Sequence, residues 1–89
     1  MGEARVHERV MRRHPELSEE DVICAWRNAF VVQERVDEQQ ERRTLIALGV
    51  DSRGRLLELM GAEDAAGVQT VFHAMTPPTV NVLFELGLG

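Results

Sequence analysis

The hydrophobic period of this chain changes once, near Phe30, and that change constrains the fold more than any other feature. Before Phe30, apolar residues recur three and four positions apart, which is the spacing of amphipathic helices. After it, apolar and polar residues alternate in short runs, which is typical of strands. Helices followed by consecutive strands predict an α+β protein in which the helices pack on an antiparallel sheet. With 89 residues, the chain is expected to form a single domain over residues 1–89.

Two helices are expected before the change of period. The first covers residues 3–14 and ends before Pro15, because a proline disfavours the helical conformation of the residue that precedes it. The second begins at Ser18, an N-cap residue, and Asp21 three positions later resembles the acidic half of a capping box. Its buried face is expected to contain the apolar residues at helical spacing, which are Val22, Ala25, Trp26, Ala29 and Phe30.

Four strands and a last short helix are expected after it. The predicted strands cover residues 30–36, 43–50, 55–60 and 68–75, and the predicted helix covers residues 79–86. Asp51 and Gly54 suit the first and last positions of a type I turn between the second and third strands. The segment from Gly61 to Gly67 is polar and predicts a loop. The expected fold class is therefore α+β, with two N-terminal helices, a four-stranded antiparallel sheet and a short C-terminal helix.

The distribution of charge sets limits on the partners of the chain. A net charge of −5 argues against indiscriminate binding to nucleic acid. All ten basic residues are arginines between Arg5 and Arg55, whereas residues 56–89 contain four acids and no base, so a basic face is expected only in the N-terminal part. The single cysteine, Cys24, cannot form an internal disulfide, and no apolar run approaches the roughly 20 residues that span a bilayer. These features predict a cytoplasmic protein without a membrane partner.

One histidine is a candidate for proton transfer. His73 stands late in the last predicted strand, just before the turn Thr76-Pro77-Pro78, and an imidazole exchanges protons near neutral pH. The alternative is a solvated histidine on the sheet, or one that is hydrogen-bonded to the turn. His7 and His14 are seven positions apart, whereas helical metal sites usually place ligands four apart. No phosphate-binding loop or dinucleotide-binding motif is present, so neither a metal nor a cofactor is expected.

Several arginines are candidates for binding phosphate. Four of them flank the second predicted strand and the turn that follows it, namely Arg42, Arg43, Arg53 and Arg55. A cluster of these guanidinium groups would stabilise charge that develops on a phosphate. The alternative is a solvated hairpin whose positive charges are offset by neighbouring acids. Arg5, Arg9 and Arg12 of the first helix could follow a phosphate backbone or meet the acidic residues of a partner.

A set of short segments, taken in order, resembles a known family. The segments are His14, Leu17-Ser18-Glu19-Glu20-Asp21-Val22, Trp26, Ala47-Leu48-Gly49, Gly54-Arg55-Leu56-Leu57-Glu58-Leu59 and His73-Ala74-Met75. Together they resemble the BrnT-like toxins of type II toxin–antitoxin systems, which share the RelE/ParE toxin fold. The resemblance extends over residues 6–79. It implies a single RelE/BrnT-like domain.

The resemblance also implies a function. It implies a toxin that is a metal-independent endoribonuclease and cleaves RNA through attack of the 2′-hydroxyl on the neighbouring phosphate. The catalytic candidates are His73, Arg55 and Glu58, and the candidates for RNA phosphate binding are Arg53, Arg43 and Arg42. In this hypothesis His73 is the general base or acid and Glu58 is a second proton-transfer group. The implied partner is an antitoxin, usually with a ribbon-helix-helix domain, so that DNA is contacted only through the antitoxin.

The last strand departs from the family pattern. In the family it usually ends in a serine-alanine-arginine type segment, followed by a basic helix. Here the matching residues are His73, Ala74 and Met75, and residues 79–86 contain no base. A second hypothesis is therefore a catalytically inactive protein of the same fold that binds a protein partner. A third, a non-catalytic nucleic-acid binder, would need basic and aromatic residues interleaved along the chain, which this sequence does not show.

Overall fold

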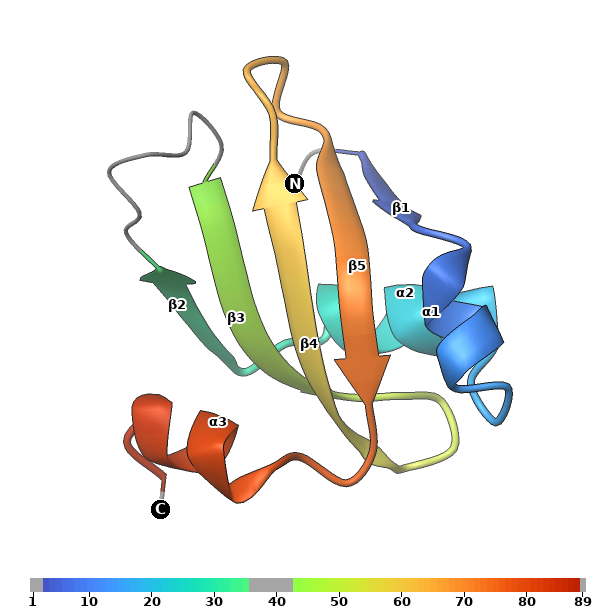
Figure 1. The fold of residues 1–89 in the computed structure, drawn as a ribbon, viewed down its shortest axis with the longest axis vertical. Coiled ribbons are helices and arrows are strands. Elements are labelled where there is room, and N and C mark those ends of the chain that lie inside the picture. Colours follow the sequence, from blue (N-terminus) through green and yellow to red (C-terminus); the bar gives the residue numbers. More distant parts are fainter. Residues whose placement is uncertain (1–2, 36–42, 89) are drawn as a thin grey trace.

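The computed structural model describes residues 3–35 and 43–88. These residues form a five-stranded sheet and three helices. The elements are β1 (Ala4–Val6), α1 (Arg9–Arg13), α2 (Glu19–Arg27), β2 (Val31–Arg35), β3 (Arg43–Val50), β4 (Leu56–Glu63), β5 (Gln69–Met75) and α3 (Val80–Glu85). The strands lie in the order β1-β5-β4-β3-β2 (Figure 1). The α+β class is confirmed.

The prediction of a four-stranded antiparallel sheet is wrong. The sheet is mixed, because β1 pairs in parallel with β5, with Ala4 opposite Gln69 and Val6 opposite Val71. The backbone N–H of His7 extends this pairing to the carbonyl of Val71 at 2.8 Å. The helix predicted over residues 3–14 is consequently only the five residues of α1. A three-residue strand has too few positions to show alternation, and its partner lies at the other end of the chain, so no local pattern indicates it.

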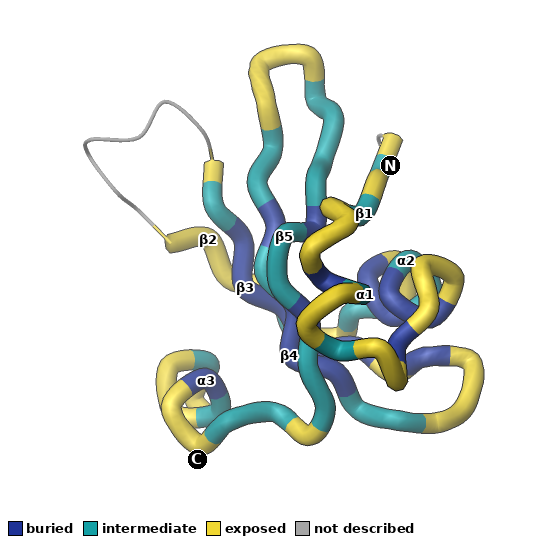
Figure 2. Tube along the Cα trace, turned by 45° about the vertical axis from the view of Figure 1, so that its right-hand side comes forward, coloured by how far each residue is buried: buried dark blue, intermediate teal, exposed yellow. Residues whose placement is uncertain are grey.

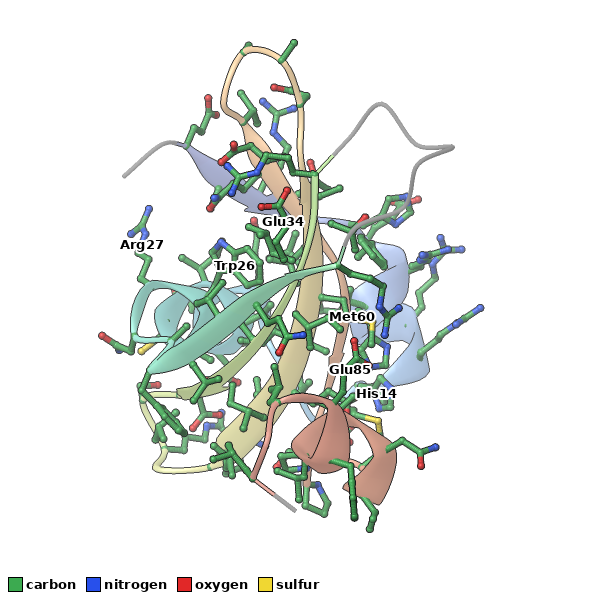
Figure 3. The ribbon with its side chains drawn as sticks, turned by 90° about the vertical axis from the view of Figure 1, so that its left-hand side faces the viewer. His14, Trp26, Arg27, Glu34, Met60 and Glu85 are labelled. Atoms are coloured by element: carbon green, nitrogen blue, oxygen red, sulfur yellow. The ribbon has the colours of Figure 1, made fainter. Side chains whose placement is uncertain are left out.

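The two faces of the sheet carry separate apolar clusters. α2 packs on one face of the sheet, here called the α2 face. The cluster on this side contains buried residues from the helices and from the strands, namely Val10, Leu17, Val22, Ala25, Trp26, Leu45, Ala47, Leu57, Leu59, Val71 and Ala74. α3 packs on part of the other, the α3 face, over Ile46, Leu48 and Val82. Figure 3 shows α2 and α3 on opposite sides of the sheet. The buried positions gather in the middle of the strands (Figure 2). The apolar cluster on the α2 face is thus larger than the one on the α3 face.

The beginning of α2 follows the sequence prediction closely. The Ser18 hydroxyl accepts a hydrogen bond from the Asp21 N–H at 3.1 Å, and the Ser18 N–H donates to the Asp21 carboxylate at 3.0 Å. The capping box is therefore confirmed, as is the burial of Trp26. The helix ends at Arg27, however, and Phe30 is exposed just before β2 instead of buried on the helix. Among the described residues, no helix is long and apolar enough to cross a membrane.

Gly61 lies inside a strand and not in the predicted loop. β4 continues to Glu63, three residues beyond the predicted end. A Cβ at Gly61 would lie 2.7 Å from the Trp26 ring, so this glycine makes room for the indole. A Cβ at Gly49 would lie 1.9 Å from the carbonyl oxygen of Ala25, which shows how closely α2 approaches β3. Both glycines serve close packing of α2 on the sheet, a role that a sequence pattern easily confuses with turn formation.

Candidate functional site

His73 and Glu58 form a close pair on the α3 face. Leu57 and Leu59 belong to the cluster on the α2 face, so Glu58 between them points to the opposite side. His73 lies opposite Met60 in the neighbouring strand and is thus diagonal to Glu58. The Nε2 atom of His73 is 2.7 Å from Oε2 of Glu58. The Glu58 side chain is 3% exposed and that of His73 is 29% exposed, so a buried carboxylate holds an imidazole that reaches solvent.

The second carboxylate oxygen of Glu58 is occupied by the start of α3. Oε1 accepts hydrogen bonds from both the backbone N–H and the hydroxyl of Thr79, each at 2.8 Å. Burial raises the pKa of Glu58, but the hydrogen bonds from Thr79 and His73 outweigh that effect, and the pKa is lower than its ordinary value. Glu58 is therefore a carboxylate near neutral pH. A buried charge in a sheet is stabilised here by three hydrogen bonds to its two oxygens.

This pairing fixes the proton arrangement of His73. An ionised carboxylate can only accept hydrogen bonds, so Nε2 of the ring must donate its proton to Glu58. In the neutral ring, Nδ1 then carries a lone pair. Within the described part of the chain, Nδ1 has no hydrogen-bond partner. A partly exposed imidazole, with one nitrogen hydrogen-bonded to Glu58 and the other without a partner, is able to accept a proton from a bound molecule.

A bulge in β5 places Phe72 on the same face as His73. The pairing of β4 with β5 shifts register between Met60 and Gly61. Val71 and Ala74 both point into the cluster on the α2 face, although they are three residues apart and not two. The two residues between them, Phe72 and His73, therefore both project toward the α3 face. Bulges commonly redirect a side chain in this way.

Arg9 contacts this bulge from α1, at the edge of the sheet. Its guanidinium carbon lies 5.8 Å from the centre of the Phe72 ring, within cation–π distance. Its Nε donates to the carbonyl oxygen of Phe72 at 3.3 Å. In the described ranges, no carboxylate is within 4.0 Å of Arg9. The guanidinium thus brings an unneutralised positive charge to the residue next to His73.

Arg55 and Arg53 lie on the other side of the sheet from this pair. Arg55 donates from Nε to Asp51 at 2.8 Å and from a terminal nitrogen to Asp21, the capping residue of α2, at 3.1 Å. It also donates to the carbonyl of Glu16 at 3.2 Å. Arg53 lies 3.8 Å from the Asp21 carboxylate. These arginines therefore connect the β3–β4 turn to α2, and the structure does not bring them to His73.

Arg43 is far from the β3–β4 turn. It stands at the first position of β3, whereas Arg53 and Arg55 follow the last, and β3 is eight residues long, which is about 25 Å. Arg43 bridges Glu34 of β2 at 3.2 Å and Glu63 of β4 at 2.9 Å. The hairpin thus separates Arg43 from the other candidates and does not cluster them. Arg42 lies outside the described residues.

Two contributors to the site, Thr79 and Phe72, give no signal in the sequence as site residues. Thr79 is far from Glu58 in the chain and looks only like the start of a helix, and Phe72 looks like an ordinary strand residue. Arg9 is a phosphate-binding candidate in the sequence, but its position beside Phe72 is not indicated there. The contact between Arg9 and Phe72 joins residues 63 positions apart. Only the β4–β5 register and the β1–β5 pairing could have indicated these neighbours. In residues 3–35 and 43–88, no group of three or more histidines, cysteines or acids is arranged to hold a metal ion.

Comparison of the chain with known protein families, with curated proteins and with solved structures found no match.

Proposed function

We propose that this chain is a metal-independent endoribonuclease and acts as the toxin of a type II toxin–antitoxin system. The observation that carries the proposal is the 2.7 Å pair between the partly exposed imidazole of His73 and the buried carboxylate of Glu58. This arrangement orients a base whose second nitrogen is open to a substrate. The segments that resemble BrnT-like toxins include both residues of this pair. In this proposal the protein acts in the cytoplasm, on cellular RNA.

The proposed reaction needs one proton acceptor beside the scissile phosphate. Nδ1 of His73 takes the proton of a ribose 2′-hydroxyl, and the 2′-oxygen attacks the adjacent phosphorus. The bond from phosphorus to the 5′-oxygen breaks, and that oxygen is protonated by water. The products are a 2′,3′-cyclic phosphate and a new 5′-hydroxyl end. No oxidant, reductant or cofactor enters this balance.

Glu58 serves this reaction as a positioning residue. Both of its oxygens already accept hydrogen bonds, and its lowered pKa keeps it ionised, so it has no proton to donate near neutral pH. Its charge also stabilises the imidazolium that forms when His73 accepts a proton. Arg55 is left out of the proposed site, because its donors bind Asp51, Asp21 and Glu16.

The test is cleavage of RNA by the purified protein in the presence of a chelator. Wild type is expected to produce fragments with 2′,3′-cyclic phosphate and 5′-hydroxyl ends, and His73→Ala is expected to abolish cleavage while the protein stays folded. His14→Ala is the matched control, since the His14 side chain lies near Glu16 at 3.7 Å instead. Induced expression in bacteria should arrest growth for the wild-type and His14→Ala proteins and should not do so for the His73→Ala protein. Folded wild-type protein that leaves RNA intact would refute the enzymatic proposal.

A second candidate function is binding of a protein partner without catalysis. It is favoured by the outer side of α3, where Val80 and Phe84 are each 71% exposed and Leu88 beyond the helix is 52% exposed. Val80 and Phe84 are four positions apart in α3 and therefore share one side of the helix; these two residues, with Leu88 after the helix, are called the α3 stripe. Exposed apolar residues in a row are typical of surfaces that another protein covers. An antitoxin of the ribbon-helix-helix type is the proposed occupant under either function, and DNA would be contacted only through it.

A further inference from the structure

The pairing of Arg9 with Phe72 has no counterpart among the other arginines of the described chain. Six of them lie within 4.0 Å of a carboxylate, namely Arg5, Arg12, Arg35, Arg43, Arg53 and Arg55. Arg9 instead packs on an aromatic ring and a carbonyl oxygen. Arg13, one helical turn further along α1, and Arg27 at the end of α2 are also exposed and without a carboxylate neighbour in the described ranges. One edge of an acidic protein therefore retains positive charge.

This positive edge adjoins the His73–Glu58 pair. The bulge of β5 turns Phe72 and His73 to the same face, and Arg9 holds the ring of Phe72 from the side of α1. Arg9 donates to the Phe72 carbonyl from Nε, and its terminal nitrogens have no hydrogen-bond partner among the described residues. The guanidinium of Arg9, the ring of Phe72 and the imidazole of His73 thus lie next to one another at the edge of the sheet.

We propose that Arg9 and Phe72 form a binding platform for single-stranded RNA beside His73. The inference rests on the proposed ribonuclease function and names the substrate form and the residues that bind it. A nucleobase stacks on an aromatic ring or on a guanidinium plane, and the free guanidinium nitrogens bind the phosphate of the same strand. Stacking of this kind requires a base that is free of a duplex. The platform therefore selects single strands and positions the adjoining ribose next to Nδ1 of His73.

The fold brings together a basic and an aromatic residue that are far apart in the sequence. Basic and aromatic residues are not interleaved in the sequence, but the parallel pairing of β1 with β5 brings α1 against the bulge 63 positions later. If Arg9 only covered the ring of Phe72 at the edge of the sheet, an uncharged side chain would serve as well. Among the described residues, no carboxylate lies within 4.0 Å of Arg9, which leaves its charge available for an anionic ligand.

Binding is measured in the His73→Ala background, so that RNA is not cleaved. A fluorescent single-stranded RNA is titrated and its anisotropy followed, with Arg9→Ala, Phe72→Leu and Arg27→Ala added separately. Arg27 is the matched control, an exposed arginine at the end of α2 that points away from the sheet (Figure 3). Arg9→Ala and Phe72→Leu are each expected to weaken binding at least about fivefold. Arg9→Ala should also reduce the salt dependence of log affinity by about 0.7, which Phe72→Leu should not do.

Several outcomes would overturn the platform. Equal affinity of the Arg9→Ala and Arg27→Ala proteins would do so, as would binding of a duplex as tight as that of the single strand. An absence of any RNA binding by the folded His73→Ala protein would also overturn it and would direct the search to a protein ligand. Failure of the ribonuclease proposal can be distinguished from failure of the platform, because RNA cleavage is measured separately with the protein that retains His73. Wild-type protein that binds RNA through Arg9 and Phe72 without cleaving it would support the platform and refute only the enzyme.

Discussion

The Nε2 atom of His73 lies 2.7 Å from the Glu58 carboxylate, whose other oxygen accepts two hydrogen bonds from Thr79. One buried charge therefore joins the proposed base on β5 to the N-terminus of α3. The stability of α3 and the orientation of the imidazole depend on the same group. Experiments on Glu58 must for this reason measure folding and RNA cleavage side by side.

Replacing Glu58 by glutamine is expected to lower RNA cleavage about a hundredfold or more, because the base then loses the carboxylate that orients it and stabilises its protonated form. Glutamine keeps the size of the side chain but removes the charge that fixes the His73 tautomer and stabilises the imidazolium. Initial cleavage rates from pH 5 to pH 9 measure the effect, and the profile should shift as well as fall. Glu85→Gln, which removes a surface partner of Arg35, is the control. Equal rates for the two variants would exclude Glu58 from the mechanism.

The stability of the protein should fall in acid through Glu58. Its pKa is lower in the folded protein than the ordinary 4.5, so the folded state binds the proton less readily than the unfolded chain. The stabilisation is complete above the ordinary pKa and is lost as the pH falls through the lowered one. Urea unfolding between pH 7 and pH 3 should show a steeper decline for wild type than for Glu58→Gln. Parallel curves would contradict the ionised state of Glu58.

Arg55 and Arg53 are expected to differ sharply in their effect on stability. The Asp51 side chain is fully buried and Asp21 is nearly so, and Arg55 neutralises both. Arg55→Ala leaves two buried carboxylates without that partner and should lower the free energy of unfolding by about 3 kcal/mol or more. Arg53 is largely exposed and 3.8 Å from Asp21, so Arg53→Ala should cost at most about 1 kcal/mol. Denaturant unfolding measures both. An Arg55→Ala protein of normal stability that fails to cleave RNA would instead restore Arg55 as a phosphate-binding residue.

The sequence predicted the parts of the fold that depend on neighbours in the chain. The capping box of Ser18 and Asp21 joins residues three positions apart, and the turn from Asp51 to Gly54 is equally local; both are present. The strand β1 depends on Val71, far along the chain, and could not be predicted from residues 4–6. A mixed sheet replaced the expected antiparallel one for that reason.

The candidate site shows the same division between local and distant information. The sequence alone indicates His73 and Glu58 as candidates, and the β4–β5 register brings them together. The arginine cluster was expected because the β3–β4 hairpin could bring its arginines together. Arg43 and Arg55 instead stand at opposite ends of that hairpin. Each has acidic neighbours of its own. The contact of Arg9 with Phe72 required the register of a bulge, which no alternation of residues reveals.

Gly49→Ala should destabilise the protein strongly. The added methyl group would lie 1.9 Å from the carbonyl oxygen of Ala25, and backbone atoms on both sides prevent either element from yielding cheaply. Overpacking of this kind costs about 3 kcal/mol, with separation of α2 from β3 as the structural consequence. Thermal unfolding followed by the fluorescence of Trp26 measures it. Unchanged stability would mean that α2 packs less closely on β3 than the structure shows.

The α3 stripe can be separated from the folding of the domain. Phe84 is largely exposed, so Phe84→Ser should change the free energy of unfolding by no more than about 0.5 kcal/mol, whereas Val82→Ser removes a buried residue and should cost several times more. If the stripe binds the antitoxin, Phe84→Ser should prevent the antitoxin from protecting bacteria that express the toxin, while RNA cleavage by the variant alone is unchanged. Copurification of the two proteins, with Val32→Ser as an exposed apolar control on β2, measures the same contact. An antitoxin that binds the Phe84→Ser and wild-type proteins equally must contact another surface, because a stripe of three residues cannot lose its central aromatic ring without a loss of affinity.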